Sequence, residues 1–438
     1  MDTIAALSTA PFRSAVAVLR LSGPDALRIA GAVFPAAARL SPRRLRFGAF
    51  RIDGRKVDEG LAAYMPGPAS YTGEDCVELY SHGSPGLAAL LLDALYRAGA
   101  RPARPGEFTR RAFENGKLDL AQAEAVVDLI DSESRAAAQN AAAQLSGALG
   151  RRIRPARDAL VGLAAHFSAV IDYPDDDIPP FFTEDALKTL REAEKTLADL
   201  LDSVREGQML TSGAVCVLAG APNAGKSSLL NALAGEDRAI VTPIPGTTRD
   251  IVDTRVVWDG VAVRLLDTAG LRDSDDPIER EGVARTRRAM ETAALVLAVY
   301  DGSQETAAPV DAPPDVPVLT VVSKADLQRR LPPLPEEYAV SAVTGSGLPA
   351  LRAGMKAALR LADVAADGTT VTNPRQASVL SRARDAVRRA ADALAAGVTP
   401  DAVMTDVEEA AAILGEITGE SASEDILAAI FSRFCVGK

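Results

Sequence analysis

The sequence predicts a multidomain α/β and α protein: an N-terminal α+β domain, a helical bundle domain and an inserted, doubly wound α/β domain. Residues 1–117 alternate short strand-like runs with a helix, which favours a compact α+β unit. Residues 118–212 and 366–438 carry apolar residues at three- and four-residue spacing, as packed helices do. Between them, residues 213–365 alternate strands and helices, which is typical of a parallel sheet covered on both faces. Two helical blocks around an α/β unit imply an insertion, whose two ends must lie close together.

Individual runs define the expected elements of each part. The α+β part is expected to contain strands at 15–21 and 76–80 and a helix at 87–98. The first helical block is broken only by the acidic, Pro-rich stretch 172–180. In the α/β part, short apolar runs predict buried strands, at 214–219, 261–266 and 316–322.

The run Gly220-Ala-Pro-Asn-Ala-Gly-Lys-Ser-Ser228 lies between an apolar strand and a helix-like stretch. Its glycines let the backbone wrap a polyphosphate, so that amide groups and a helix N-terminus point at the oxygens. Lys226 would reach the outer phosphates, and the Ser227 hydroxyl would bind Mg²⁺. The loop residues expected to contact the nucleotide are Asn223, Ala224, Gly225, Lys226, Ser227 and Ser228.

Two downstream motifs select the nucleotide. Asp267-Thr-Ala-Gly270 follows a predicted strand and resembles the D-x-x-G element of P-loop GTPases, in which the Asp holds Mg²⁺ through water. Ser323-Lys-Ala-Asp326 resembles the guanine-reading N-K-x-D element, because a carboxylate accepts hydrogen bonds from guanine that adenine cannot donate. GTP is therefore expected rather than ATP. The contacts expected from this part are Asp267, Thr268, Ala269, Gly270, Lys324, Asp326, Ser341 and Ala342.

Ser323 stands where these proteins usually have Asn, whose amide ties the base loop to the phosphate loop. A hydroxyl keeps part of that contact, so we expect weaker nucleotide affinity without a change of base preference.

The turn-rich run 243–250 is expected to be a switch loop, with Thr248 as the second protein ligand of Mg²⁺. Leu271 follows Gly270 where many small GTPases have the Gln that orients the attacking water, so another group must supply the catalysis. Asn223 could offer its side-chain oxygen to a monovalent cation. Arg249 and Arg272 are competing cationic groups, and the residues alone leave the choice open.

Motifs outside the nucleotide site extend the resemblance over essentially the whole chain. They are Asp2-Thr-Ile-Ala-Ala6, Val18-Leu-Arg-Leu-Ser-Gly23, Tyr71-Thr-Gly-Glu-Asp-Cys-Val-Glu78, Arg104-Pro-Gly-Glu-Phe108, Lys117-Leu-Asp-Leu-Ala-Gln-Ala-Glu124 and Phe434-Cys-Val-Gly-Lys438. Together they resemble the tRNA-modification GTPase family MnmE, also called TrmE. The resemblance implies a folate-binding and dimerising domain at 1–117 and a GTPase domain at 213–365.

The resemblance also implies a reaction and its partners. The family forms homodimers and works with the flavoprotein GidA (MnmG), as a heterotetramer. It adds an aminomethyl-type group, carboxymethylaminomethyl, to carbon 5 of the wobble uridine of certain tRNAs. The one-carbon unit comes from a tetrahydrofolate derivative, 5-formyl- or methylene-tetrahydrofolate. The family's folate-binding positions fall on Arg20, Glu78, Lys117 and Lys438.

The family pattern assigns further roles in the GTPase part and at the end of the sequence. K⁺ binding falls on Asn223, Thr242, Ile244 and Thr247, and GTP contacts also fall on Thr242, Gly246, Thr247 and Thr248. Glu279 matches the acid that orients water; without the family it would be an ordinary solvated acid at a helix start. Cys435 matches a functional thiol, with a packed free thiol as the alternative. Residues 11–15 depart from the family's glycine-rich run, which makes the folate affinity less certain.

Composition places limits on the partners. The chain has 438 residues, 47% of them apolar, enough for three domains each with a core. Three irregularly spaced cysteines, with no signal peptide and no membrane-spanning stretch, indicate a cytoplasmic protein. A net charge of −11 argues against broad attraction to nucleic acid, and the dense basic runs 151–157 and 382–389 are expected to be solvated helix faces more often than RNA contacts.

The alternative function is a regulatory GTPase switch in ribosome assembly.

Overall fold

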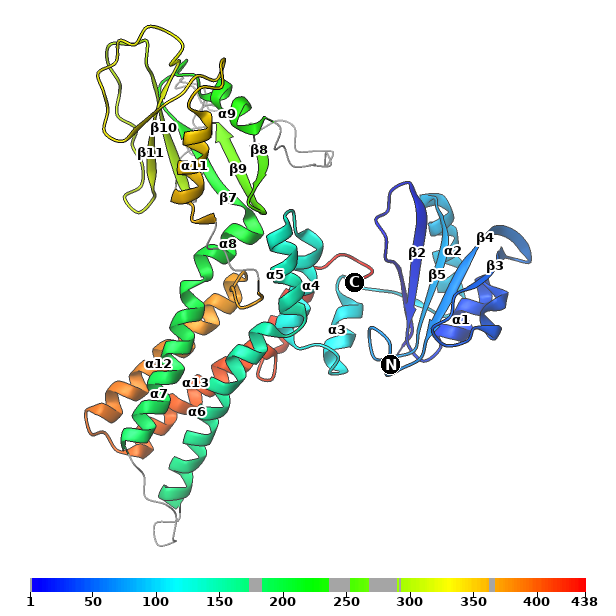
Figure 1. Cartoon of the computed structure of the whole chain (residues 1–438). Helices are drawn as coiled ribbons and strands as arrows, with labels where there is room; N and C mark the ends of the chain where they lie inside the picture. The colour runs from blue at the N-terminus through cyan, green and yellow to red at the C-terminus, as the bar shows by residue number, and fades with distance from the viewer. Residues whose placement is uncertain (1, 173–182, 236–252, 268–289, 291–292, 362–366) are drawn as a thin grey trace, which may run out of the picture. The chain divides into compact units, whose positions relative to one another are not determined.

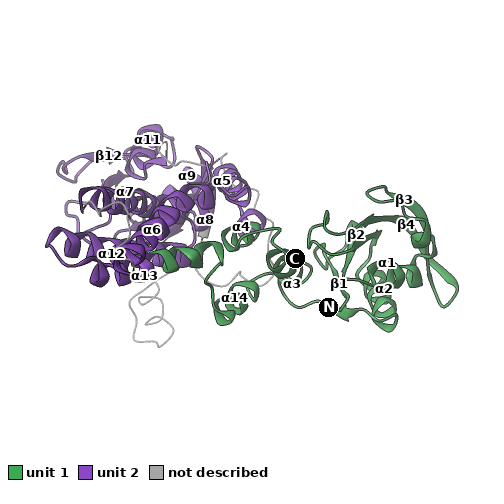
Figure 2. Ribbon diagram, turned by 90° about the horizontal axis from the view of Figure 1, so that it is seen from below, with its two compact units in different colours: residues 1–127, 411–438 green, residues 128–410 purple. Residues whose placement is uncertain are grey.

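The computed structural model describes residues 2–172, 183–235, 253–267, 290, 293–361 and 367–438. The chain divides into two compact units (Figure 2). Unit 1 combines residues 1–127 with 411–438, and unit 2 contains residues 128–410. Two helices, α4 (Leu120–Asp131) and α13 (Pro400–Thr418), continue from one unit into the other. Unit 1 is thus assembled from segments that lie far apart in the sequence.

Unit 1 is built on a six-stranded sheet with the order β3-β4-β5-β2-β1-β6 (Figure 1). Its strands are β1 (Ile4–Leu7), β2 (Ser14–Ser22), β3 (Arg46–Ile52), β4 (Arg55–Met65), β5 (Cys76–Gly83) and β6 (Arg101–Pro102). The helices of this part are α1 (Ala26–Val33), the 3₁₀ helix η1 (Pro35–Arg39), α2 (Pro85–Arg97) and α3 (Glu107–Glu114). Leu19 and Leu79 of the sheet are fully buried in one core with Ile29 of α1 and Leu91 of α2. The two helices therefore bury one face of the sheet.

The C-terminal segment of unit 1 packs against α3 and the end of β1. The rings of Phe113 in α3 and Phe431 in α14 (Glu424–Phe431) are 6.3 Å apart, and Arg110 forms an ion pair with Glu424 at 2.5 Å. The Ser8 hydroxyl donates a hydrogen bond to the Gly437 carbonyl at 3.1 Å. A β carbon on Gly437 would lie 2.2 Å from the Leu7 carbonyl oxygen, so this approach requires glycine.

Unit 2 contains a second six-stranded sheet, with the order β12-β11-β10-β7-β9-β8 (Figure 1). Only β8 runs antiparallel, at one edge. The elements of this α/β part are β7 (Ala214–Ala219), α9 (Lys226–Ala234), β8 (Asp253–Trp258), β9 (Val261–Asp267), β10 (Leu295–Asp301), β11 (Val318–Ser323), β12 (Glu337–Ala339) and α11 (Leu348–Ala358). The predicted doubly wound α/β fold is confirmed.

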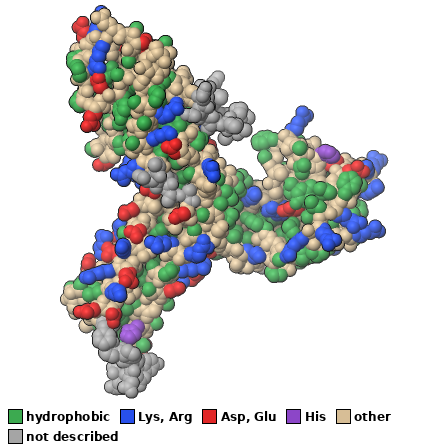
Figure 3. Space-filling view, viewed as in Figure 1, with side chains coloured by type: hydrophobic (Ala, Val, Ile, Leu, Met, Phe, Trp, Pro, Cys, Tyr) green, Lys and Arg blue, Asp and Glu red, His purple; other side chains and the backbone are tan. Residues whose placement is uncertain are grey.

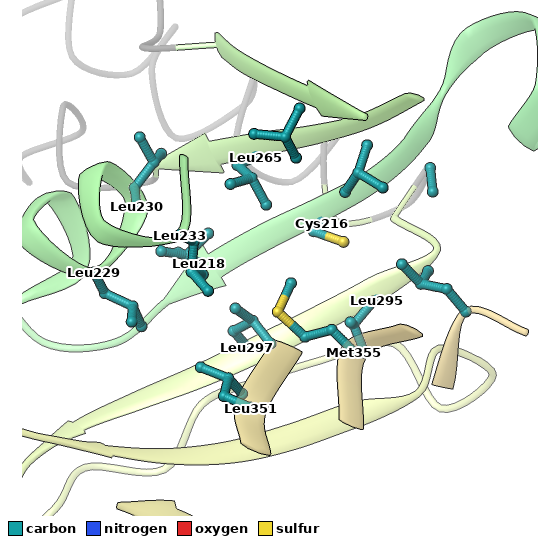
Figure 4. Packing of buried hydrophobic residues seen from close by; sticks show 14 of the residues in the cluster. Cys216, Leu218, Leu229, Leu230, Leu233, Leu265, Leu295, Leu297, Leu351 and Met355 are labelled. Atoms are coloured by element: carbon teal, nitrogen blue, oxygen red, sulfur yellow. The ribbon is translucent and has the colours of Figure 1, made fainter. Parts of the chain in front are cut away.

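Both faces of this sheet are covered, which explains the uninterrupted apolar strands. Cys216 and Leu218 point to one face and Val217 and Ala219 to the other, and the two pairs belong to different cores. In the first core, leucines of α9 lie beside Leu218, and Leu351 and Met355 of α11 lie beside Leu297 (Figure 4).

The helices of unit 2 lie on both sides of the α/β part in the sequence. They are α5 (Arg135–Leu145), α6 (Ala148–Asp172), α7 (Thr183–Asp202), α8 (Val204–Ser212) and α12 (Pro374–Ala395). α12 begins after an Asn373 cap, with Pro374 in its first turn, and packs against α7. The two connections to the α/β part lie side by side, because the Ser203 hydroxyl accepts a hydrogen bond from the Val371 amide at 3.1 Å and Gly207 contacts the Val371 carbonyl.

These observations confirm the predicted fold class, with an α+β domain, a helical part and a doubly wound α/β domain. The domain limits at residues 117, 212 and 365 stay a prediction. Cys76 and Cys216 are buried, whereas Cys435 is exposed, against the alternative of a packed thiol at that position. Across the described ranges, no helix has both the length and the apolar character needed to cross a bilayer.

Candidate functional site

The predicted phosphate loop follows β7 and ends at the first turn of α9. Gly220 has φ +153°, and a β carbon there would lie 2.1 Å from the Val299 carbonyl oxygen, so only glycine fits. Asn223 and Gly225 are left-handed, with φ of 64° and 88°. Gly225 is the N-cap of α9 and offers no side-chain cap, which leaves the first amides of the helix available to an anion.

Lys226 lies folded over this loop. Its ammonium donates hydrogen bonds to the carbonyls of Gly220 and Ala221, both at 2.8 Å, and the residue is 4% exposed. Burial lowers the pKa of the ammonium, while the nearby Asp267 carboxylate opposes that change. A desolvated cation next to a ring of backbone amides is suited to phosphate oxygens.

Ser227 and Asp267 meet at the ends of α9 and β9. The Ser227 hydroxyl donates a hydrogen bond to the Asp267 carboxylate. β7 and β9 are parallel neighbours, so the residues that follow them emerge at the same edge of the sheet. A hydroxyl and a carboxylate are hard oxygen donors, which fits Mg²⁺ bound between protein and phosphate.

Ser323 joins the phosphate loop to the loop after β11. Its hydroxyl lies 2.6 Å from the Ala224 carbonyl and 3.0 Å from the Tyr300 carbonyl. Ser323 is 5% exposed, so little water competes for these contacts. The expectation that a hydroxyl keeps part of the contact made by Asn elsewhere agrees with this geometry.

The loop after β11 presents two of the predicted guanine-contacting residues, and both are held by neighbours. The Lys324 ammonium pairs with Asp301 at 2.6 Å. Burial opposes ionisation of Asp301, but the hydrogen bonds from Lys324 and Ser303 outweigh it and lower its pKa to about 2. The exposed Asp326 accepts a hydrogen bond from the buried Ser341 hydroxyl at 2.6 Å. The sequence did not predict Asp301 as a site residue, nor the role of Ser341 in orienting Asp326. The sequence signal for Asp301 is that it is a charged residue at the end of the apolar strand β10.

The other predicted residues of the GTPase part lie outside the described residues. This applies to the K⁺, Mg²⁺ and nucleotide positions of the switch loop, to the rest of the D-x-x-G motif and to the water-orienting acid: Thr242, Ile244, Gly246, Thr247, Thr248, Thr268, Ala269, Gly270 and Glu279. The two competing cationic residues, Arg249 and Arg272, lie outside them as well.

In unit 1, Arg20 and Glu78 are directly opposite each other on the neighbouring strands β2 and β5. Their ion pair is 2.9 Å long, and each side chain is 16% exposed. The second oxygen of Glu78 accepts a hydrogen bond from the Tyr80 hydroxyl at 2.5 Å. Burial, and then this contact, raises the pKa of Tyr80 to about 12, so the phenol stays protonated and donates to the carboxylate.

Two aromatic rings flank the Arg20 guanidinium. Its central carbon lies 5.2 Å from the centre of the Tyr71 ring and 5.7 Å from that of Phe108. The Tyr71 hydroxyl is in turn bonded to Thr109 at 2.9 Å. These aromatic residues were not predicted as site residues, although both belong to motifs that carry the family resemblance. A charged pair beside flat rings suits a ligand that combines an aromatic heterocycle with carboxylates.

Lys438 lies close enough to Arg20 and Glu78 to interact with both charges, and Cys435 lies near Lys438. Burial lowers the pKa of Lys438, and so does the charge of Arg20, whereas Glu78 and Cys435 oppose the change. The Lys438 amide also donates to the Cys435 carbonyl at 3.4 Å. Lys117 follows α3, and its ammonium donates to the carbonyl of Pro68, on the loop that carries Tyr71, at 3.0 Å. The structure thus brings Arg20, Glu78 and Lys438 together. In the described part of the chain, the side chain of Lys117 bonds to Pro68 and not to these three residues.

Known proteins of one family match this chain over its whole length. The family model for the MnmE helical domain matches residues 120–435, and the model described as GTP-binding protein TrmE N-terminus matches residues 3–117. The tRNA modification GTPase MnmE of Chloroflexus aurantiacus is 44% identical, with 100% of each chain covered. Those of Roseiflexus sp. (strain RS-1) and Akkermansia muciniphila are each 43% identical, with 100% of this chain and 99% of the relative covered. This chain therefore belongs to the MnmE (TrmE) family.

Proposed function

We propose that the protein hydrolyses GTP and, with a flavoprotein of the GidA (MnmG) kind, modifies the wobble uridine of certain tRNAs in the cytoplasm. The observation that carries the GTPase part is the phosphate loop. Lys226, Ser227 and Asp267 gather there, and Ser323 ties the loop to the residues expected to read guanine. The tRNA part rests on the family, whose curated members are named tRNA modification GTPases.

The residues of the loop have separate tasks in phosphoryl transfer. The amides at the start of α9 and the Lys226 ammonium offset the charge that builds on the phosphate oxygens. Ser227 and Asp267, with Thr248 from the switch loop, would hold Mg²⁺, which neutralises phosphate charge when bound. Glu279 is proposed to orient the attacking water, since Leu271 cannot.

A monovalent cation is proposed to complete the site. Asn223 is exposed and left-handed, so its side chain is available to an ion beside the phosphates. K⁺ held by Asn223, Thr242, Ile244 and Thr247 would bring positive charge to the place where other systems insert an arginine. Turnover of GTP is expected to rise when K⁺ replaces Na⁺ and to become salt-independent in Asn223→Ala. Equal rates of the unaltered protein in both salts would favour Arg249 or Arg272 instead.

The Arg20 site is proposed to bind a tetrahydrofolate derivative, 5-formyl- or methylene-tetrahydrofolate. Arg20 and Lys438 offer cationic groups to carboxylates, and Glu78 offers an acceptor to the amino and ring N–H groups of a pterin. Lys117 is proposed to contribute from the segment after α3, and Cys435 to act as a functional thiol. Titration with 5-formyl-tetrahydrofolate, followed by calorimetry, should show binding that Arg20→Ala abolishes. No binding by the unaltered protein would favour the alternative, a regulatory GTPase in ribosome assembly.

Nucleoside analysis tests the proposed reaction itself. A strain that lacks this chain should lose the carboxymethylaminomethyl-type modification at carbon 5 of wobble uridine, as measured by mass spectrometry of digested tRNA. Expression of the unaltered chain should restore it, and Lys226→Met should not. An unchanged nucleoside profile in the deletion strain would contradict the proposal. Light scattering with and without the flavoprotein tests the expected homodimer and heterotetramer.

A further inference from the structure

Charge is distributed unevenly along this chain. Residues 1–117 contain 16 Lys and Arg against 11 Asp and Glu, a formal net charge of +5, whereas the chain as a whole carries −11. The positive charge of the N-terminal part is therefore set against a strongly acidic remainder. Such an asymmetry is typical of a protein with a local site for a polyanion.

Most of this positive charge is concentrated in one short segment. Seven basic residues and a single acid, Asp53, fall between residues 39 and 56. All seven side chains belong to exposed residues, at the end of η1, in the loop that follows it and along the β3–β4 hairpin. Figure 3 shows Lys and Arg side chains gathered over this end of unit 1. We call the following six arginines the basic edge: Arg39, Arg43, Arg44, Arg46, Arg51 and Arg55.

The basic edge has no carboxylate partner among the residues that the structure describes. Its side chains donate only to backbone carbonyls: Arg43 to Ala69, Arg46 to Arg39 and Arg51 to Gly54. Other arginines of unit 1 are neutralised by acids, and they are Arg20, Arg28, Arg101, Arg110 and Arg111. The positive potential of the basic edge is therefore not cancelled locally.

The position in the sheet makes the basic edge accessible. β3 is the last strand on its side, so its outer edge is not covered by another strand. The aromatic Phe47 lies on the same strand and is 65% exposed. Exposed cationic groups and an exposed aromatic ring on one surface segment are features of proteins that bind phosphates and stack nucleobases.

The basic runs that the sequence singles out in the helices are less suited to this task. Arg388 pairs with Glu194 at 2.8 Å, and Arg389 pairs with Asp406 and Glu409. Arg152 lies 3.8 Å from Asp199. An arginine that already has a carboxylate must break that pair to bind a phosphate.

We propose that the basic edge binds the phosphodiester backbone of the RNA substrate. This inference rests on the proposed action on tRNA and adds a contact made by this chain itself. A second copy of the chain placed symmetrically on the same surface is disfavoured, since like charges would face each other. Backbone contacts carry no sequence information, so different tRNAs should bind the basic edge with similar affinity.

The test compares two triple variants of the full-length chain that remove the same charge. Arg39→Gln with Arg44→Gln and Arg55→Gln removes three arginines of the basic edge whose side chains form no ion pair with any residue that the structure describes. Arg152→Gln with Arg388→Gln and Arg389→Gln is the matched control, taken from paired arginines. Binding of a fluorescent tRNA transcript is measured by anisotropy between about 50 and 200 mM salt, the range over which phosphate contacts dominate affinity.

The basic-edge variant loses three phosphate contacts, so the magnitude of the slope of log affinity against log salt concentration should fall by about 2. Its affinity for tRNA near 0.1 M salt should fall by about tenfold or more. The control should stay within about twofold. The proposal is overturned if both triple variants lose tRNA affinity equally, or if the basic-edge variant binds tRNA unchanged. It is also overturned if the basic-edge variant changes only the oligomeric state of the protein. Binding of polyglutamate but not of tRNA would also overturn it and assign the surface to an acidic protein. GTP turnover and the deletion strain's nucleosides report separately on the proposed function.

Discussion

The phosphate loop and the Arg20 site are assembled over very different distances along the chain. Lys226 folds back onto carbonyls five and six residues before it, so the loop is set by its own few residues. The Arg20 site takes its groups from β2, β5 and the segment that carries Lys438. That segment is held in place by the hydrogen bond between Ser8 and Gly437, which are 429 positions apart in the sequence. A local loop can therefore be damaged by one side chain, whereas the assembled site also depends on how distant segments dock.

The largest expected effect is that of Lys226→Met on the phosphate loop. The variant loses the buried ammonium next to the phosphate-binding amides, so GTP turnover should fall by about 10²-fold or more. Phosphate release under steady-state conditions measures this. Lys356→Met, which removes only a surface pair with Asp259, is the control and should leave turnover within about twofold. If turnover persists in Lys226→Met, the loop does not act as described, while folate binding should be unaffected in either variant.

The docking of the C-terminal segment is tested by Gly437→Ala. The added β carbon would lie 2.2 Å from the Leu7 carbonyl oxygen, at a φ of +100°, and strain of this kind costs about 1–3 kcal/mol. Affinity for 5-formyl-tetrahydrofolate, measured by calorimetry, should therefore fall by about tenfold, with GTP turnover unchanged. Gly54→Ala also has a positive φ but meets open space, and it should not change that affinity. A Gly437→Ala protein that binds folate normally would show that Lys438 does not need this docking.

Ser323→Ala is expected to have a moderate effect on the nucleotide site. It leaves the Ala224 carbonyl without its hydroxyl donor, at a cost of about 1 kcal/mol, so the Kd for GTP should rise about fivefold. The preference for GTP over ATP should stay, because Asp326 and Ser341 are untouched. Ser323→Asn is the matched variant and should bind GTP at least as tightly as the unaltered protein. A loss of base preference in Ser323→Ala would contradict this division of roles.

The last prediction concerns acid stability and the variant Asp301→Asn. The pKa of the Asp301 carboxyl is 3.8 in the unfolded chain and about 2 in the folded protein. Its contacts therefore stabilise the fold above about pH 4, and this stabilisation is lost as the pH falls toward 2. The contribution is about 1–2 kcal/mol. Urea unfolding of both proteins at pH 7 and at acidic pH should show a difference that shrinks on acidification. A difference that is constant with pH would rule out the Lys324 pair as its source.

The fold could be predicted from the sequence because its signals are local. The uninterrupted apolar strands, such as Val261–Asp267, and the glycine-rich turn before α9 each indicate their structure within a few residues. The same is true of Gly220 and Lys226, whose roles follow from residue type and spacing. The basic edge is visible in the sequence as a dense run of arginines, but its position at the edge of the sheet and its exposure needed the structure.

The groups around Arg20 could not be derived from local patterns. The pairing of Arg20 with Glu78 follows from strand register, and a shift of one residue would put Glu78 on the other face of the sheet. Tyr71 and Phe108 reach the guanidinium from loops and helices that no periodicity connects. The resemblance to a family predicted Arg20, Glu78 and Lys438 as site residues. The aromatic residues that flank Arg20 could be identified only from the structure.

The two-segment construction of unit 1 has a consequence for its synthesis. Residues 2–127 leave the ribosome well before residue 411 is made, and at about 5–20 residues per second the delay is about 15–60 s. Throughout that interval Phe113 has no Phe431 to pack against, and α3 presents an apolar surface to the cell. A nascent chain of this protein is thus exposed to chaperones and proteases at α3 until residues 411–438 have been made.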